Sequence, residues 1–278
     1  MSTECNHDCS SCQQNCGDRK APAKIKPNAG ANIKKVIAVV SGKGGVGKSL
    51  VTSSLAVLMN RRGHRVGILD ADVTGPSIPT GFGLTEKAMG TALGIAPAVT
   101  KEGIRVMSLN LLLPNANDPV VWRGPVIGGA VQQFWTDVVW GNVDYLFIDM
   151  PPGTGDVPLT VFQSLPVDGI VVVTSPQDLV SMIVEKALKM SAMMQVPVLG
   201  LVENMSYFEC PNCHEKHFIF GESHLEDLAT QYEISHTARI PMDIQTAALF
   251  DQGKIETLQN SPLETLVTAL ETELPIEK

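Results

Sequence analysis

Several kinds of residue and segment are scarce in this chain. Aromatic side chains make up only 5% of it, and it has no run of about 18 consecutive apolar residues such as a membrane-spanning helix requires. The residues from Met1 to Cys5 lack the apolar core of a secretory signal, so we expect a cytoplasmic protein with no membrane partner. Acidic residues outnumber basic ones by 29 to 21, and the net charge of −8 disfavours a nucleic-acid binder that neutralises phosphates.

Apolar and small residues are plentiful instead. Apolar residues account for 44% of the 278 positions, which is enough for a substantial core. From Lys35 onward, β-branched apolar runs alternate with helical patterns, which predicts an α/β fold with a doubly wound, mostly parallel sheet and right-handed crossovers. The expected strands are residues 36–40, 66–69, 104–109, 145–148, 170–174, 198–202 and 238–240. The expected helices are residues 49–61, 126–139, 157–165, 179–193, 225–232, 244–250 and 263–274.

The N-terminal residues differ from the rest of the chain. Residues 1–32 show no apolar periodicity and contain a cluster of cysteines followed by a polar, proline-bearing stretch at 18–28. We therefore expect a short, flexible cysteine-bearing extension over residues 1–32, made of a cysteine module and a linker. Residues 33–278 are expected to form one P-loop ATPase domain that carries a further cysteine pair.

The glycine-rich segment 42–49 follows an apolar strand and precedes a helical pattern. It fits G-x-x-x-x-G-K-[ST], in which glycines let backbone N–H groups turn toward an anion at the positive end of a helix. Lys48 then reaches the β- and γ-phosphates, and the Ser49 hydroxyl ligates Mg²⁺. The nucleotide-binding residues predicted from this loop are Gly42, Lys43, Gly44, Gly45, Val46, Gly47, Lys48 and Ser49.

Lys43 is an addition to this pattern, because an ordinary phosphate loop needs only one lysine. The stretch Lys-Gly-Gly-Val-Gly-Lys-Ser at 43–49 resembles the signature of the deviant phosphate-loop ATPases, the MinD/ParA-like branch of the SIMIBI class of P-loop NTPases. The resemblance implies ATP rather than GTP. It also implies a nucleotide sandwich dimer in which Lys43 reaches the partner's nucleotide, with Lys43 and Lys48 both catalytic.

Acidic residues follow the second and fourth expected strands, at the sheet edge where open α/β folds bind ligands. There, Asp149 and Asp70 can approach Mg²⁺, although a solvated turn acid is the alternative for Asp70. The segments 70–79 and 149–156 resemble switch I and switch II of the same ATPases. By that resemblance, Asp72 activates the attacking water and Asp149 supports the metal.

Asn204 directly follows the expected strand 198–202 and its short continuation. Its amide both donates and accepts, which matches the edge of adenine, and the resemblance supports that role. A turn-forming asparagine is the alternative. In the same ATPases, the loop that corresponds to 239–243 packs on the base.

Cys210 and Cys213 form a Cys-x-x-Cys pair, which supplies half of a four-ligand shell. Three completions are open: His214 and His217, the N-terminal cysteines, or the same pair from a second chain. The first has far tighter spacing than a zinc finger, and two-fold symmetry favours the third. Thiolates suit zinc and iron–sulfur clusters equally, and a redox-active dithiol or two structural cysteines are further readings.

Five motifs together resemble the Mrp/Nbp35 family of iron–sulfur cluster carriers across residues 34–253. They are Lys-Gly-Gly-Val-Gly-Lys-Ser, Asp-x-Asp-x-x-Gly-Pro-Ser, Asp-x-Pro-Pro-Gly-Thr-Gly-Asp, Asn-Met-Ser and Cys-Pro-x-Cys, in this order. The resemblance implies a homodimer that binds ATP and Mg²⁺ and bridges a [4Fe–4S] cluster through Cys210 and Cys213 of each subunit. It further implies delivery of the cluster to apo iron–sulfur proteins, gated by ATP binding or slow hydrolysis.

A second group of cysteines lies at the N-terminus and supplies four ligands by itself. It loosely resembles the N-terminal cluster site of the Nbp35 branch, which implies a second [4Fe–4S] cluster. Zinc is the alternative, and His7 could then replace one thiolate. The residues of this group are Cys5, Cys9, Cys12 and Cys16.

Two other functions use a similar loop and dimer. Partition and division-site ATPases bind DNA or membranes through basic surfaces, but residues 263–277 of this chain contain acids and no basic residue. Nitrogenase-reductase-like electron donors bridge a cluster through single cysteines in separate loops, whereas this chain has the pair at 210 and 213.

Overall fold

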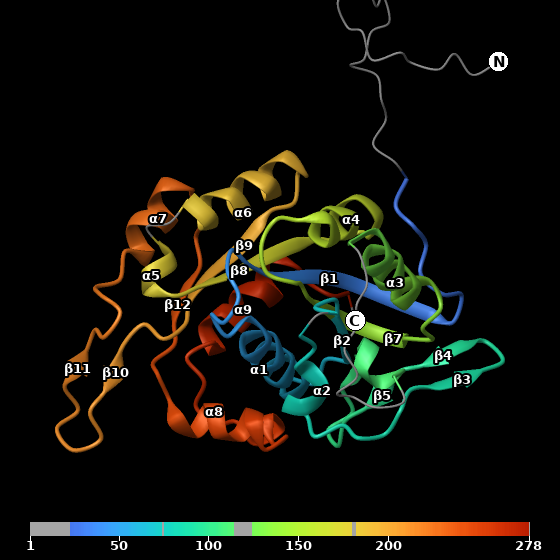
Figure 1. The fold of residues 1–278 in the computed structure, drawn as a ribbon, viewed down its shortest axis with the longest axis horizontal. Helices are drawn as coiled ribbons and strands as arrows, with labels where there is room; N and C mark the ends of the chain where they lie inside the picture. Colours follow the sequence, from blue (N-terminus) through green and yellow to red (C-terminus); the bar gives the residue numbers. More distant parts are fainter. Residues whose placement is uncertain (1–22, 74, 114–123, 180–181, 278) are drawn as a thin grey trace, which may run out of the picture.

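The computed structural model describes residues 23–73, 75–113, 124–179 and 182–277, and in them one eight-stranded sheet carries helices on both faces (Figure 1). The strand order is β12-β9-β8-β1-β7-β2-β6-β5, and every pair is parallel except β5 with β6, which confirms the doubly wound α/β fold. The sheet strands are β1 Ala31–Ser41, β2 Val66–Asp70, β5 Ala98–Val99, β6 Arg105–Met107, β7 Gly141–Asp149, β8 Gly169–Thr174, β9 Val198–Glu203 and β12 Thr237–Arg239. The helices are α1 Lys48–Arg61, α2 Ile78–Gly81, α3 Gly124–Thr136, α4 Asp156–Ser164, α5 Pro176–Leu179, α6 Met182–Met193, α7 Leu225–Gln231, α8 Ile244–Asp251 and α9 Glu264–Glu273.

Strand β1 lies in the middle of the sheet, between β7 and β8. Its side chains alternate between two apolar layers, as expected for a strand covered on both faces. Val36, Ala38 and Val40 pack on the side of α3, α4, α6 and α7, whereas Ile37 and Val39 pack on the side of α1 and α9. The loop that follows β1 is therefore held at the centre of the sheet's carboxyl edge by two cores.

Every strand and helix expected from the sequence is present, with shifted ends. The expected strand 104–109 shortens to β6, and a 3₁₀ turn over Leu109–Leu111 follows it. The expected helix 179–193 is split into α5 and α6.

The sequence patterns did not reveal the short helix α2 or several short strands. β3 (Met89–Thr91) pairs antiparallel with β4 (Gly94–Ala96), and β10 (Phe208–Glu209) pairs antiparallel with β11 (Lys216–His217). A strand of two or three residues shows no periodicity, so only tertiary pairing defines it.

The stretch before β1 is fixed to the sheet domain, contrary to the expectation of a flexible linker up to residue 28. The Ile25 backbone N–H donates to the Ser164 carbonyl at 2.8 Å, and the Trp135 indole donates to the Ile25 carbonyl at 2.9 Å. The Lys24 ammonium donates to the Phe162 carbonyl. Residues 24–28 thus form a strap across α3 and α4. The cysteine module itself lies outside the described residues.

No helix within the described residues is both long enough and apolar enough to cross a bilayer. The helices instead use their apolar residues to cover the sheet.

Candidate nucleotide and thiolate sites

The predicted phosphate loop lies between the end of β1 and the start of α1. Gly45 and Gly47 have φ of +81° and +82°, a region that L side chains rarely adopt. A Cβ on Gly47 would also stand 2.1 Å from the Asn204 amide nitrogen, so this position is restricted to glycine twice over. The loop therefore presents its backbone N–H groups at the N-terminus of a buried helix, as an anion site requires.

Lys48, Ser49 and Thr52 on α1 converge on Asp149 at the end of β7. Asp149 Oδ2 lies 2.7 Å from Lys48 Nζ and accepts a hydrogen bond from Ser49 Oγ at 2.6 Å. Its Oδ1 accepts from Thr52 Oγ1 at 2.7 Å. Both charged side chains are buried, so each compensates the other's desolvation. Thr52 was not anticipated from the sequence, although it lies one helical turn after Lys48.

Asp70 and Asp72 lie in different surroundings, although only Ala71 separates them in the sequence. Asp70 is buried at the end of β2, and its Oδ2 and Oδ1 accept from Ser108 Oγ at 3.0 Å and from the Asp72 N–H at 3.1 Å. It is therefore not a solvated turn acid. Burial, followed by the neighbouring Asp149 carboxylate, raises the pKa of Asp70 well above its ordinary value.

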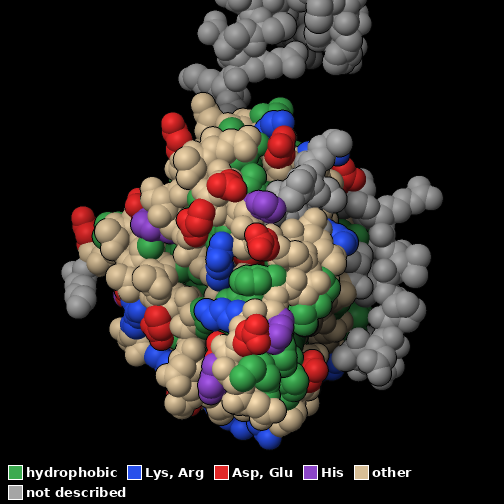
Figure 2. Space-filling view, turned by 90° about the vertical axis from the view of Figure 1, so that its left-hand side faces the viewer, with side chains coloured by type: hydrophobic (Ala, Val, Ile, Leu, Met, Phe, Trp, Pro, Cys, Tyr) green, Lys and Arg blue, Asp and Glu red, His purple; other side chains and the backbone are tan. Residues whose placement is uncertain are grey.

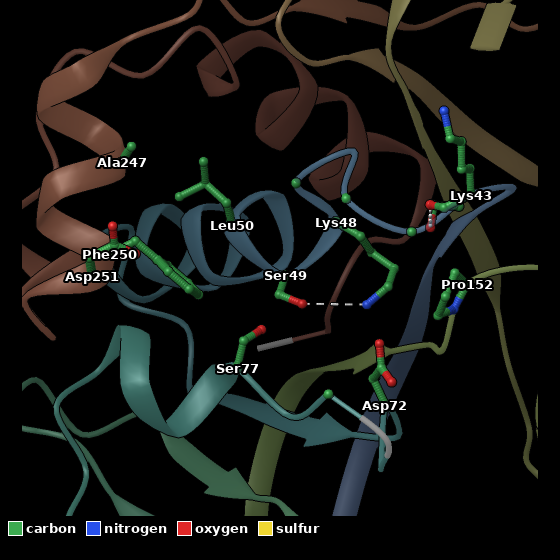
Figure 3. A pocket seen from close by; sticks show the side chains of 15 residues that line it. Lys43, Lys48, Ser49, Leu50, Asp72, Ser77, Pro152, Ala247, Phe250 and Asp251 are labelled. Atoms are coloured by element: carbon green, nitrogen blue, oxygen red, sulfur yellow. Dashed lines mark hydrogen bonds between the residues drawn. The ribbon is translucent and has the colours of Figure 1, made fainter.

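Asp72 lines the cavity over the phosphate loop, with Lys48 on the facing side (Figure 3). Ser49, Asp72 and Asp149 together offer a hydroxyl and two carboxylates, which are the oxygen donors that Mg²⁺ prefers. This donor set fits a divalent cation.

Two adjoining cavities share Gly45, Gly47, Leu50 and Ala247 of their walls. The first, of about 340 Å³, has polar lining from the loop and the acids above and is closed by Phe250 and Asp251 of α8 (Figure 3). The second, of about 320 Å³, is mostly apolar. Its other lining residues are Asn204, Met205, Ile240, Pro241, Met242, Asp243, Ile244 and Thr246. The first cavity is the more polar of the two, and this pairing suits a molecule with a phosphate end and a flat base.

Asn204 lies at the wall of the second cavity and is buried. Its Nδ2 donates to the Val46 carbonyl at 2.9 Å, so part of the amide is already bound to the phosphate loop. The remaining atoms of the Asn204 amide are left to make the predicted contact with adenine. That role stays a prediction.

Lys43 is exposed, and Figure 3 shows its amine directed away from Ser49 and Asp72. The loop around it is held by the Ser41 hydroxyl, which donates to the Lys43 carbonyl at 3.0 Å, and by the Gly153 N–H, which donates to the Ser41 carbonyl at 2.8 Å. The side chain is thus oriented outward from its own phosphate site.

Cys210 and Cys213 occupy the turn of the β10–β11 hairpin, which projects from the sheet domain (Figure 1). The N–H groups of Cys213 and Asn212 point at the Cys210 sulfur and, with the Cys213 thiol, lower the pKa of Cys210. The His214 N–H donates to the Cys210 carbonyl at 2.9 Å, and His214 has φ of +59°. The turn therefore stabilises the thiolate form of Cys210 relative to an ordinary cysteine.

The histidine completion of this pair is not assembled. His214 Nδ1 lies 3.1 Å from Glu209 Oε1, and the His217 ring lies against Phe208. Across the part of the chain that the structure describes, no cluster of three or more His, Cys, Asp or Glu residues could hold a metal ion. Cys5, Cys9, Cys12 and Cys16 lie outside that part, so their expected role stays a prediction.

Figure 2, which views the side of the molecule on the left of Figure 1, shows apolar groups mixed with charges of both signs.

Comparisons with known proteins agree with this geometry. A family model described as "ParA: NUBPL iron-transfer P-loop NTPase" matches residues 32–274. The iron-sulfur cluster carrier protein of Methanocaldococcus jannaschii is 45% identical over 260 residues, which cover 90% of this chain and 89% of that protein. The cytosolic Fe-S cluster assembly factor CFD1 of Chaetomium globosum is 42% identical over 240 residues, covering 81% and 79%.

Solved structures give the same result. A nucleotide-binding protein from Archaeoglobus fulgidus in complex with ADP has a TM-score of 0.77 at 46% identity and covers 84% of this chain and 92% of its own. The MinC:MinD complex of Aquifex aeolicus has a TM-score of 0.61 at 16% identity, covering 88% and 98%, and shares the fold alone. The Mrp/Nbp35 resemblance is confirmed, and the chain belongs to the NUBPL iron-transfer P-loop NTPase family.

Proposed function

We propose that two copies of this chain hold one [4Fe–4S] cluster between them and deliver it to apo iron–sulfur proteins, with ATP binding and slow hydrolysis controlling the step. The observation that carries the proposal is the thiol pair at the hairpin turn, which has no third ligand within the described residues. Two such pairs related by a two-fold axis supply four thiolates, the usual complement of such a cluster.

The surroundings of the pair support contact with a second copy. Phe218 and Ile219 follow β11, in the same hairpin segment as the pair, and are 43% and 58% exposed. Exposed apolar side chains beside an incomplete ligand set favour burial against another subunit. The half-buried Cys210 and exposed Cys213 are also accessible to an acceptor protein.

The phosphate loop supports the nucleotide part of the proposal. Lys48 exchanges its contact with Asp149 for the β- and γ-phosphates, and Ser49 and Asp149 then hold Mg²⁺, which supplies positive charge to the phosphate oxygens. Asp72 orients a water for attack on the γ-phosphorus, and the bond to the ADP oxygen breaks. Lys43 of each chain acts on the nucleotide of the other. The relatives are named for cluster transport, and the relative from Chaetomium globosum is named cytosolic, so we place this chain in the cytoplasm too.

Anaerobic reconstitution with iron and sulfide tests the proposal. Cys210→Ala should lose cluster transfer to an apo acceptor and keep Mg-ATP binding, because the thiol is remote from the phosphate loop. Lys48→Ala should keep the cluster and lose the response to nucleotide. Normal transfer by Cys210→Ala, with the same iron content as the parent chain, would rule out the assigned site.

A second, N-terminal cluster is a separate proposal that rests on Cys5, Cys9, Cys12 and Cys16. Replacing Cys5 and Cys9 with serine should lower the bound iron of the reconstituted protein while the pair at 210 and 213 stays loaded. Unchanged iron content removes the second cluster and leaves the first untouched.

A further inference from the structure

The last residue of β9 and the first residue of the cysteine hairpin are separated by residues 204–207 alone. Asn204 begins this stretch and grips the phosphate loop through its hydrogen bond to the Val46 carbonyl. The nearness of its amide to Gly47 shows how closely the two segments fit. One end of a very short link thus touches the nucleotide site, and the other end carries the thiol pair.

Asn204, Ser206 and Tyr207 of the link are hydrogen-bonded to neighbouring segments. The Ser206 hydroxyl donates to Glu203 Oε1, and both side chains are fully buried. The Ser206 N–H donates to the Ile240 carbonyl at 2.9 Å, and the Met242 N–H donates to the Tyr207 carbonyl at 2.7 Å. A stretch held this way passes a displacement on to its neighbour instead of absorbing it.

The second carboxylate oxygen of Glu203 is an anomaly of the interior. Oε2 is buried and has no hydrogen-bonding partner in the structure. Leaving such an atom unpaired costs free energy, and neither the phosphate loop nor the thiol pair uses it. We therefore assign the role of this carboxylate to its other oxygen, Oε1, which accepts the hydrogen bond from Ser206. That bond also holds the turn at Met205, where φ is +55°.

We propose that Glu203 and Ser206 form a positioning pair that couples nucleotide occupancy to the arrangement of Cys210 and Cys213. When phosphate binds the loop, the backbone around Val46 adjusts, and the Asn204 amide follows the carbonyl that it holds. The Glu203–Ser206 contact transmits that shift to the base of the hairpin. The coupling gives the proposed cluster carrier its control step and rests on that function, but it is measurable without a cluster.

Thiol alkylation of the metal-free full chain tests the coupling. Iodoacetamide reacts with Cys210 and Cys213, and mass spectrometry follows the peptide that carries them, with and without saturating Mg-ADP. In the parent chain we expect the rate to change by about fivefold on adding Mg-ADP. Ser206→Ala should lose most of this change, while calorimetry shows that it binds Mg-ADP as the parent chain does.

Three further variants make the result decisive. Glu203→Ala removes the same contact from the other side and serves if Ser206→Ala does not fold. Glu203→Gln keeps an acceptor for the Ser206 hydroxyl and should keep the nucleotide dependence. Ser223→Ala removes a hydroxyl that lies after the hairpin in the sequence and accepts a hydrogen bond from the Leu225 N–H at 3.2 Å, and this variant should also keep the nucleotide dependence.

A parent chain whose alkylation ignores Mg-ADP, or a Ser206→Ala chain that retains the full change, overturns the inference. Neither result touches the cluster-carrier proposal, which stands or falls on iron content and transfer.

Discussion

At the scale of the residue, Gly47 carries two constraints at once. Its positive φ costs an L side chain about 1–2 kcal/mol, and a Cβ there would collide with the Asn204 amide nitrogen. We expect Gly47→Ala to weaken Mg-ADP binding roughly tenfold or more, measured by calorimetry.

Gly129→Ala is the matched control for this substitution. Gly129 lies inside α3, has no positive φ, and a Cβ there meets no atom within 4 Å. Its ADP affinity should equal that of the parent chain. Equal affinity in Gly47→Ala as well would show that the loop does not use this backbone conformation to bind phosphate.

Asp70 gives a prediction about pH. Burial and Asp149 raise its pKa in the folded state, so the folded protein holds this proton more tightly than the unfolded chain does. The resulting stability is present below the unfolded pKa and is lost as pH rises through the raised folded pKa. We expect Asp70→Asn to flatten that part of the fall in unfolding free energy with pH, measured by urea denaturation at a series of pH values.

Glu222→Gln, at an exposed position before α7, is the control and should leave the slope unchanged. An Asp70→Asn protein with the same slope as the parent chain would show that Asp70 does not gain a proton on folding.

At the scale of the element, the strap over residues 24–28 positions the segment that precedes β1. The Trp135 indole holds its Ile25 carbonyl, and the loss of one such hydrogen bond costs about 1 kcal/mol. Trp135→Phe should therefore release the strap more often, so trypsin cleaves after Lys24 about fivefold faster. Gel electrophoresis of a digestion series measures the rate.

Trp140→Phe is the matched control for the strap. The Trp140 indole makes a comparable hydrogen bond, to the Phe134 carbonyl at 3.0 Å, without contacting Ile25. It loses the same kind of bond from the same core, so faster cleavage in both variants would assign the effect to general destabilisation.

The sequence was informative about elements in proportion to their length. Runs such as Val36–Val40 identify a buried strand unaided, and the glycine pattern located the turn between β1 and α1. The sequence did not predict the strand pairs β3–β4 and β10–β11, because turns and neighbouring segments of the fold fix their pairing. The roles of Thr52, Ser108 and Glu203 were not predicted from the sequence either. Each side chain acquires its role from a residue at least three positions away, which only the fold or a turn brings close.

At the scale of the whole molecule, the orientation of the Lys43 side chain bears on the proposed dimer. Its amine lies away from the chain's own phosphate site, which agrees with action on a partner's nucleotide (Figure 3). Lys43→Ala should bind Mg-ADP normally in calorimetry. It should lose ATP-dependent dimerisation, measured by light scattering, together with at least about tenfold of the ATPase rate.

Lys101→Ala removes an exposed lysine from a turn elsewhere on the sheet domain and should alter neither property. A Lys43→Ala chain that dimerises and hydrolyses ATP as the parent does would contradict a role across the dimer. The MinD-like neighbours, at 16–20% identity, share the fold alone.

The ion pair between Lys48 and Asp149 has a consequence for the protein at rest. The ammonium already balances the carboxylate that a metal ion would otherwise neutralise, so the ligand-free pocket carries no uncompensated pair charge. Binding of the metal–nucleotide complex then exchanges one counterion of the Asp149 carboxylate for another and does not fill a site of uncompensated charge. Lys48 and Asp149 therefore compensate each other's buried charge.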